Sequence, residues 1–375
     1  DMIIYNDGSD EIHNALANLA ITTLATSGTA VIGAAGTTGI SVGGIPFYSA
    51  DNSIYTHDVS GTDNAAAQNA AYGVDALDAI TTGDHNSAFG FKALSGNTTG
   101  ARNVALGRSA LEVPDTENDN IAIGYNAMAG AVAGGEFNVA IGSEALDALT
   151  SADNNTAVGY QAGSAITTGA NNVIVGESAA LTGVAAANNV IIGQDAAKAM
   201  GTGDVTGNVI IGTGAVDTGV FTGANNVVIG KLAGQDMTSA DANVIIGEDA
   251  GKGLTTSNGN VLIGQGAGEA LTTGTDSIFI GFQAGDGHDT ESNNLGIGKT
   301  ALGGTLTGTT NVGIGNLALA VLTSGAGNVA LGYNAGKTTT TGDNNVAIGA
   351  GAMSLGTATG DRNIAIGTNA GTDIT

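Results

Sequence analysis

The feature that most constrains this chain is a tandem repeat of 17 residues that begins with Asn, three mostly apolar residues and Gly. The spacing between copies widens to 18 or 19 residues only after Asn120, Asn189, Asn208 and Asn345. The segment that begins at Asn52 resembles one further, degenerate copy. The eighteen regular copies begin at Asn69, Asn86, Asn103, Asn120, Asn138, Asn155, Asn172, Asn189, Asn208, Asn226, Asn243, Asn260, Ser277, Asn294, Asn311, Asn328, Asn345 and Asn363.

Counted from this first residue, the anchor, the consensus is N-V-A-I-G-x-x-A-(L/G)-x-x-L-T-T-G-x-N, and positions five and eight are Gly and Ala in all eighteen copies. Positions two to four have strand character, while the Gly, Thr-Thr-Gly and Asn-Asn segments are turn signals. So small a unit has no core of its own, and copies must stack on one another. The sequence therefore predicts an all-β chain, a parallel β-solenoid (β-roll) that rises about 4.8 Å per coil and extends about 85 Å.

The anchor Asn and the strand pattern make two further predictions. An Asn in nearly every copy indicates a ladder in which each side-chain amide bonds the next coil. Alternate strand residues point to opposite faces, so we expect the Val and Ile of positions two and four inside the coil and position three outside. Since position three is also apolar in every copy, an apolar column faces outward whichever parity holds.

An outward apolar stripe of about 800 Å² exceeds what monomers usually leave exposed, so we expect a second copy of the chain to cover it. The residues predicted to form this subunit seam are the large apolar residues at position three: Ile174, Ile191, Ile210, Val228, Ile245, Leu262 and Phe279.

The motif N-V-A-I-G at Asn138–Gly142 and Asn345–Gly349 resembles the head repeats of YadA-like trimeric autotransporter adhesins. Asn155–Gly163 and Thr167–Gly169 are similar to arrays in phage tail-fibre proteins. The resemblance covers the chain from about Asn52 to its end, although the adhesin repeats are shorter. It implies left-handed coils packed as a homotrimeric fibre on a virion surface or on a cell surface, in the extracellular space.

The first fifty residues lack the repeat, and the sequence predicts residues 1–51 as a mixed N-terminal connector or neck and residues 52–375 as the β-solenoid shaft. Asp7 is suited to cap a short helix whose apolar face contains Ile12, Leu16 and Leu19. The chain ends within a repeat, and a tip, a chaperone or an anchor is expected to follow.

Composition excludes several classes of function. Thirty-four acidic against nine basic residues, a net charge of −25, disfavour nucleic acid as a partner. There is no Cys, which excludes thiol catalysis and zinc–thiolate sites, and no apolar run of about 18 residues that would insert in a membrane.

No group of residues has the spacing of a catalytic or metal site, so we expect neither an enzyme nor a cofactor. His13, His57, His85 and His288 are scattered and are each expected to be exposed to solvent. The acidic segments 115–120 and 286–291 could hold calcium, but they have neither the Gly position of a helix-loop-helix calcium site nor the GGxGxD pattern of calcium β-rolls, and solvated loops are favoured.

Position six carries aromatic residues in five copies: Phe91, Tyr125, Tyr160, Phe282 and Tyr333. Two interpretations remain open. The rings could stack on a cell-surface glycan, or they could fill grooves between subunits, which we favour.

The predicted function is a structural or adhesive fibre shaft that presents a recognition region for host attachment, with itself as partner and a surface glycan or receptor as a further one. An alternative is an ice-binding solenoid that uses Thr-Thr-Gly corners such as Thr81-Thr82 and Thr272-Thr273. A β-helical polysaccharide depolymerase is less favoured, because so regular a coil leaves no room for a cleft with paired carboxylates.

Overall fold

The computed structural model describes residues 65–131, 133–203, 205–355 and 359–372, together with the backbone of three strands between residues 40 and 55. The helix expected after Asp7 lies outside the described residues.

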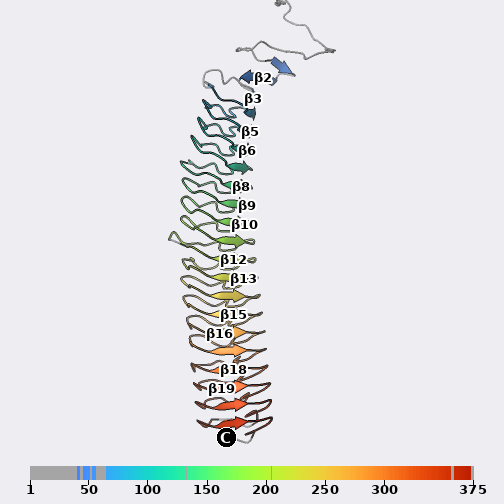
Figure 1. The fold of residues 1–375 in the computed structure, drawn as a ribbon, viewed down its shortest axis with the longest axis vertical. Helices are drawn as coiled ribbons and strands as arrows, with labels where there is room; N and C mark the ends of the chain where they lie inside the picture. Colours follow the sequence, from blue (N-terminus) through green and yellow to red (C-terminus); the bar gives the residue numbers. More distant parts are fainter. Residues whose placement is uncertain are drawn as a thin grey trace, which may run out of the picture.

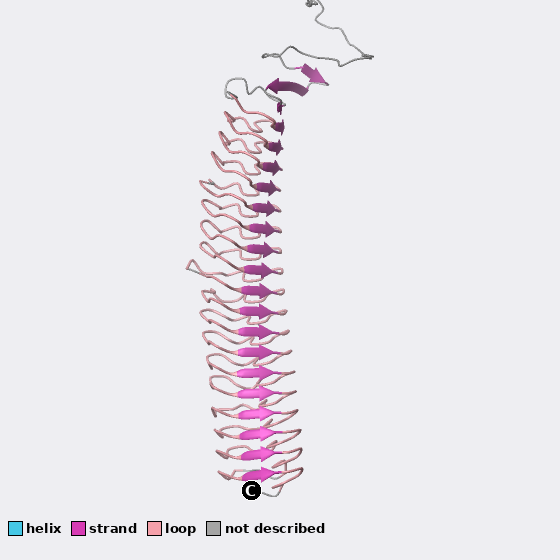
Figure 2. Ribbon diagram, viewed as in Figure 1, coloured by secondary structure: helices cyan, strands magenta, loops and turns pink. Residues whose placement is uncertain are grey.

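Each regular copy of the repeat forms one coil with a single three-residue strand, and these strands stack in one column along a rod (Figure 1). The other side of every coil consists of turns (Figure 2), and the described residues contain no helix. The prediction of a parallel β-solenoid is therefore confirmed. The strands are β1 (Ile40–Val42), β2 (Ile45–Ala50), β3 (Ser53–Tyr55), β4 (Ala70–Tyr72), β5 (Ser87–Phe89), β6 (Val104–Leu106), β7 (Ile121–Ile123), β8 (Val139–Ile141), β9 (Thr156–Val158), β10 (Val173–Val175), β11 (Val190–Ile192), β12 (Val209–Ile211), β13 (Val227–Ile229), β14 (Val244–Ile246), β15 (Val261–Ile263), β16 (Ile278–Ile280), β17 (Leu295–Ile297), β18 (Val312–Ile314), β19 (Val329–Leu331), β20 (Val346–Ile348) and β21 (Ile364–Ile366).

From β4 to β21 successive strands pair in parallel and in register, so each position of the repeat forms a column along the rod. Ile210 of β12 pairs with Val228 of β13. The register also holds across the widest spacing, where Ile191 of β11 pairs with Ile210. Extra residues are therefore accommodated in the turns and leave the strand column undisturbed.

Backbone hydrogen bonds join the turns of neighbouring coils as well as their strands. The backbone N–H of Leu146 donates to the carbonyl of Ala162 at 3.1 Å, and that of Thr150 donates to Thr167 at 3.0 Å. At position five the coils approach so closely that a Cβ on Gly230 would lie 2.3 Å from the carbonyl oxygen of Gly247. Gly230 also has φ +144°, a conformation that favours glycine, which explains the Gly at position five in every copy.

Position three lies inside the coil, which corrects the expected parity. The middle residue of every strand from β4 to β21 is buried, whereas its two neighbours are partly or fully exposed. The narrow interior is already occupied by positions eight, nine and twelve, and it has room for only one column from the strand. The residues predicted as the subunit seam have no exposed surface and belong to the core instead: Ile174, Ile191, Ile210, Val228, Ile245, Leu262 and Phe279.

Positions three and nine share the interior volume in most coils. In most coils with Ala at position three, position nine is a large residue, as in the pair Ala105 and Leu111, which are both fully buried. Where position three is Phe279, position nine is Gly285, and a Cβ there would lie 2.4 Å from the Phe279 ring. Since protein interiors are close-packed, a large residue at one position requires a small one at the other.

The strands that precede the regular coils pair differently. β1 and β2 are antiparallel, as are β2 and β3. β3, which follows Asn52, joins the parallel column through a bridge between Ile54 and Ala70.

Candidate functional surfaces

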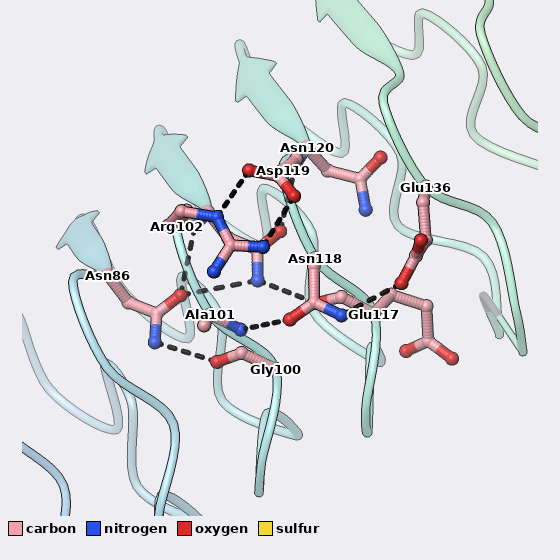
Figure 3. A network of polar contacts seen from close by, with 10 residues as sticks. Asn86, Gly100, Ala101, Arg102, Glu117, Asn118, Asp119, Asn120 and Glu136 are labelled. Carbon is pink, nitrogen blue, oxygen red and sulfur yellow. Dashed lines mark hydrogen bonds and ion pairs between the residues drawn. The ribbon is translucent and has the colours of Figure 1, made fainter.

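The anchor Asn side chains form a continuous buried ladder, which confirms the sequence prediction. The Oδ1 atom of Asn226 accepts the backbone N–H of Asn243 at 2.9 Å and the side-chain amide of Asn243 at 3.1 Å. That amide also donates to the carbonyl of Ser257 at 2.9 Å. Figure 3 shows another step, in which the amide of Asn86 donates to the Gly100 carbonyl at 2.8 Å. Each anchor thus ties neighbouring coils together.

Ser277, the single exception, preserves only part of this pattern. Its backbone N–H donates to Asn260 Oδ1 at 2.9 Å, and its hydroxyl oxygen accepts the N–H of Asn294 at 3.2 Å. The hydroxyl proton is directed to the carbonyl of Thr275 at 3.3 Å. A Ser therefore continues the ladder as an acceptor but supplies fewer donors than an Asn.

Polar residues just before the anchors form further bonds between coils (Figure 3). The N–H of Ala101 donates to Asn118 Oδ1 at 2.8 Å, and the Asn118 amide donates to Glu136 at 2.8 Å. The guanidinium of Arg102 makes two bonds to the carboxylate of Asp119, at 2.6 and 2.7 Å. Hydrogen bonding from Arg102 lowers the pKa of Asp119. These contacts hold the stack together, and the charges of Arg102 and Asp119 compensate each other.

In the acidic segments considered for calcium, glutamate carboxylates accept hydrogen bonds from the chain's own backbone. The carboxylate of Glu117 accepts the N–H groups of Asp115 at 2.8 Å, Thr116 at 3.0 Å and Gly134 at 2.8 Å. Glu291 accepts the corresponding groups of its own turn, Asp289 at 3.0 Å and Thr290 at 3.1 Å. Across the described ranges, no three His, Cys, Asp or Glu side chains gather in a way that would hold a metal ion.

His288 is buried, contrary to the expectation that it is exposed. It occupies position twelve, a core position, and its ring centre lies 4.7 Å from that of Phe279. Neither ring nitrogen has a hydrogen-bond partner in the structure. Burial lowers the pKa of His288 to about 4, and the charge of Glu291 and the backbone of Leu302 offset only part of this effect. His85 is exposed, whereas His13 and His57 lie outside the described residues.

The first Thr of the Thr-Thr-Gly corners bonds between coils. The hydroxyl of Thr81 donates to the carbonyl of Thr98 at 2.9 Å, and that of Thr272 donates to Asp289 at 3.1 Å. The second Thr of each corner is exposed, as at Thr82. Its column is interrupted where other residues take its place, for example Gly134 and Ala185.

An apolar band, formed by positions two and four of the coils, follows the outward face of the strand column. Position four is apolar in every coil, and position two is polar only at Ser87 and Thr156. Most of these side chains are partly exposed, and the more accessible ones include Leu106 at 49% and Leu331 at 41%. At about 4.8 Å per coil the band is about 85 Å long.

The five predicted aromatic residues at position six lie on the surface, between 41% and 57% exposed: Phe91, Tyr125, Tyr160, Phe282 and Tyr333. Each directly follows the Gly corner, next to the apolar band. The structure does not bring them together into one cluster, since Tyr160, Phe282 and Tyr333 lie in separate parts of the rod. It does place Arg108, which the sequence reasoning missed, in the same column between Phe91 and Tyr125.

A groove of about 400 Å³ on the surface is lined by Asp236, Lys252, Glu269 and Asp286 together with Gly253 and Ala270. The ammonium of Lys252 pairs with Asp249 at 3.2 Å, and burial raises the pKa of Asp286. These lining residues include no hydroxyl or thiol nucleophile. The absence of enzymatic activity stays a prediction.

Comparison of the chain with family models, curated proteins and solved structures gives no match. Within the residues that the structure describes, no helix is long and apolar enough to cross a membrane.

Proposed function

We propose that this chain is the rigid shaft of a homotrimeric fibre on a virion or cell surface, and that it presents a recognition region for attachment to a host. The observation that supports this proposal is the apolar band. A band about 85 Å long and about 10 Å wide has an area of about 800 Å², which is what each partner contributes to a stable protein interface. Covering it also removes an exposed patch larger than monomers usually carry.

A second copy of the chain is the occupant that fits this band best. The band repeats with the rise of the coils, so only a partner with the same period can match it along its whole length. Copies of the same chain have this period because they have the same repeat. We infer three chains in the oligomer from the resemblance of the N-V-A-I-G repeats to trimeric fibre heads, in which narrow bands from three chains meet on one axis.

The interior of the coils supports a mechanical role. Backbone bonds, the Asn ladder and the corner Thr hydroxyls join each coil to the next around its circumference. Such a stack resists bending and local unfolding, as a shaft requires. The ice-binding alternative is less well supported, because the first Thr of corners such as Thr81-Thr82 and Thr272-Thr273 is engaged in these bonds and the column of the second Thr is interrupted at Gly134 and Ala185.

Charges placed on the band test the proposal. We expect the wild-type chain to sediment with three times its mass of 36.2 kDa. The triple variant Ile192→Asp, Ile211→Asp and Ile263→Asp places carboxylates at position four, where burial against a partner costs several kcal/mol for each unpaired charge. We expect it to sediment as a monomer while its circular dichroism remains that of the folded coil, because these side chains point away from the core.

The matched control is Thr168→Asp, Thr256→Asp and Thr273→Asp, which adds three charges at exposed turn positions outside the apolar band. It should remain trimeric. A wild-type chain that sediments as a monomer or a dimer at micromolar concentration would overturn the trimer, as would a position-four variant that stays trimeric. Ile210→Asp is not a test of the oligomeric state, because Ile210 is fully buried and a charge there would unfold the core of its own coil.

A further inference from the structure

Three side chains at position six of successive coils form an exposed column that we call the Arg108 ladder: Phe91, Arg108 and Tyr125. The guanidinium carbon of Arg108 lies 5.8 Å from the ring centre of Phe91 and 5.5 Å from that of Tyr125. The ammonium of Lys92 lies 5.7 Å from the same Phe91 ring. Phe91 and Tyr125 are 41% and 43% exposed, and Arg108 is also exposed.

The backbone beneath the ladder is held in place by the coil stack. The carbonyl of Phe91 accepts the N–H of Ser109 at 2.9 Å, and the carbonyl of Arg108 accepts the N–H of Asn126 at 3.0 Å. The column therefore stands on a rigid surface, which lowers the entropic cost of binding a ligand.

Arg108 differs from most other basic residues of the described chain because its charge has no carboxylate partner within 4.0 Å. The described ion pairs instead involve Lys92, Arg102, Lys198, Lys231 and Lys252. Lys299, Lys337 and Arg362 are also outside these ion pairs, but among the described residues only Arg108 lies near two aromatic rings. Arg108 lies between these two rings along the column, and without a carboxylate partner its N–H donors remain available to solvent.

We propose that the Arg108 ladder binds an acidic saccharide through the carboxylate of a sugar ring. Arg108 donates two parallel N–H bonds to the planar carboxylate, a geometry that its fork matches and that a lysine does not. The exposed surfaces of Phe91 and Tyr125 contact the apolar C–H faces of the adjacent sugars. Aromatic rings rather than further cations flank the guanidinium, which favours a saccharide with few charges over a polyphosphate.

The ladder lies within a single chain, so this site does not depend on the proposed trimer. It assigns a recognition role to the shaft itself, in addition to any region that the shaft presents.

Titration calorimetry of the full chain with sialyllactose, a trisaccharide with one carboxylate, tests the site, and the methyl ester of the same trisaccharide serves as a neutral isostere. We expect the acid to bind and the ester to bind at least about tenfold more weakly, because a charged bidentate hydrogen bond is lost. Arg108→Gln should weaken binding of the acid by at least about tenfold, whereas Arg108→Lys should retain part of the affinity.

The matched control is Lys299→Gln. The ammonium of Lys299 lies 5.6 Å from the ring centre of Phe282, and both residues occupy position six. Lys299 has only this one ring neighbour, and its ammonium lacks the planar fork of N–H donors that a guanidinium has. This variant should keep the wild-type affinity within about twofold. Circular dichroism verifies that every variant is folded, which is expected because Arg108 and Lys299 are exposed.

Three results would overturn the proposal. The first is no binding of sialyllactose or of digalacturonate, a second carboxylated saccharide, at millimolar concentration. The second is equal binding of inorganic sulfate, which would show a simple anion site. The third is an Arg108→Gln variant that binds the saccharides normally but loses its oligomeric state in sedimentation, which would make the ladder part of a subunit contact.

Discussion

The substitution Asn226→Ala tests whether the Asn ladder holds the coils together. The Asn226 side chain accepts the N–H of Asn243 at 2.9 Å and donates to the carbonyl of Ala240 at 2.8 Å. It also donates to Asn208 Oδ1 at 3.1 Å and to Ala224 at 3.1 Å. Asn226 has no exposed surface, so water does not readily replace these partners.

The expected loss follows from the groups that remain unpaired. An Ala leaves the N–H of Asn243 without its acceptor and the carbonyl of Ala240 without its donor, and each buried unpaired group costs about 1–3 kcal/mol. We therefore expect Asn226→Ala to lower the local free energy of unfolding by about 4 kcal/mol. Asn226→Ser should lose about 2 kcal/mol, because a hydroxyl still accepts the next N–H, as Ser277 does for Asn294.

Native-state hydrogen exchange is the suitable assay, because a repeat protein can open one part at a time. Protection should fall at the amide of Asn243 and in the adjoining coils. The control is Asn316→Ala at exposed position six, which should change the free energy by less than about 0.5 kcal/mol. Equal protection in Asn226→Ala and Asn316→Ala would refute the reasoning. Ser277→Asn, the reverse change, should raise protection in its own coil.

Two further predictions concern a turn and the core. Gly230→Ala should lower the free energy of unfolding by at least about 3 kcal/mol in urea titration, because its φ is +144° and its Cβ would lie 2.3 Å from the Gly247 carbonyl; a loss under about 1 kcal/mol would contradict this. His288 has its pKa lowered to about 4, so the unfolded chain binds a proton that the folded chain does not, and stability should be lost as pH falls from about 6.5 toward 4. Between pH 7.5 and pH 4, the wild-type chain should lose about 3 kcal/mol more unfolding free energy than His288→Leu, as measured by unfolding titrations at both pH values. Parallel pH profiles for the two proteins would show that His288 is not the cause.

The sequence alone was sufficient to predict the coil, the place of its strand and the Asn ladder. These features depend on spacing: a 17-residue repeat must stack, and stacking brings each position next to its own copy. The in-register pairing of Ile210 with Val228 and the bond from Asn243 to Asn226 follow from that repetition. Three-dimensional packing was not needed to foresee them.

The inward face of the strand was decided only by the tertiary structure. Positions two, three and four are apolar in nearly every copy, so the alternation that normally separates the two faces carries no signal here. The interior selects position three because positions eight, nine and twelve leave space for one strand column. The exchange of volume between Ala105 with Leu111 and Phe279 with Gly285 was present in the sequence and could have revealed this contact.

The same limit applies to the candidate sites. Counting from the anchor places His288 at a core position and Arg108 between Phe91 and Tyr125, so their columns were available from spacing. The burial of His288 and the unpaired charge of Arg108 could not be predicted from spacing. The burial that leaves His288 without a hydrogen bond, and the ring distances and missing carboxylate that leave Arg108 unpaired, depend on how neighbouring coils fill space around each side chain. Repetition along the chain determines which residues become neighbours, and close packing across the coil determines which of them are shielded from water.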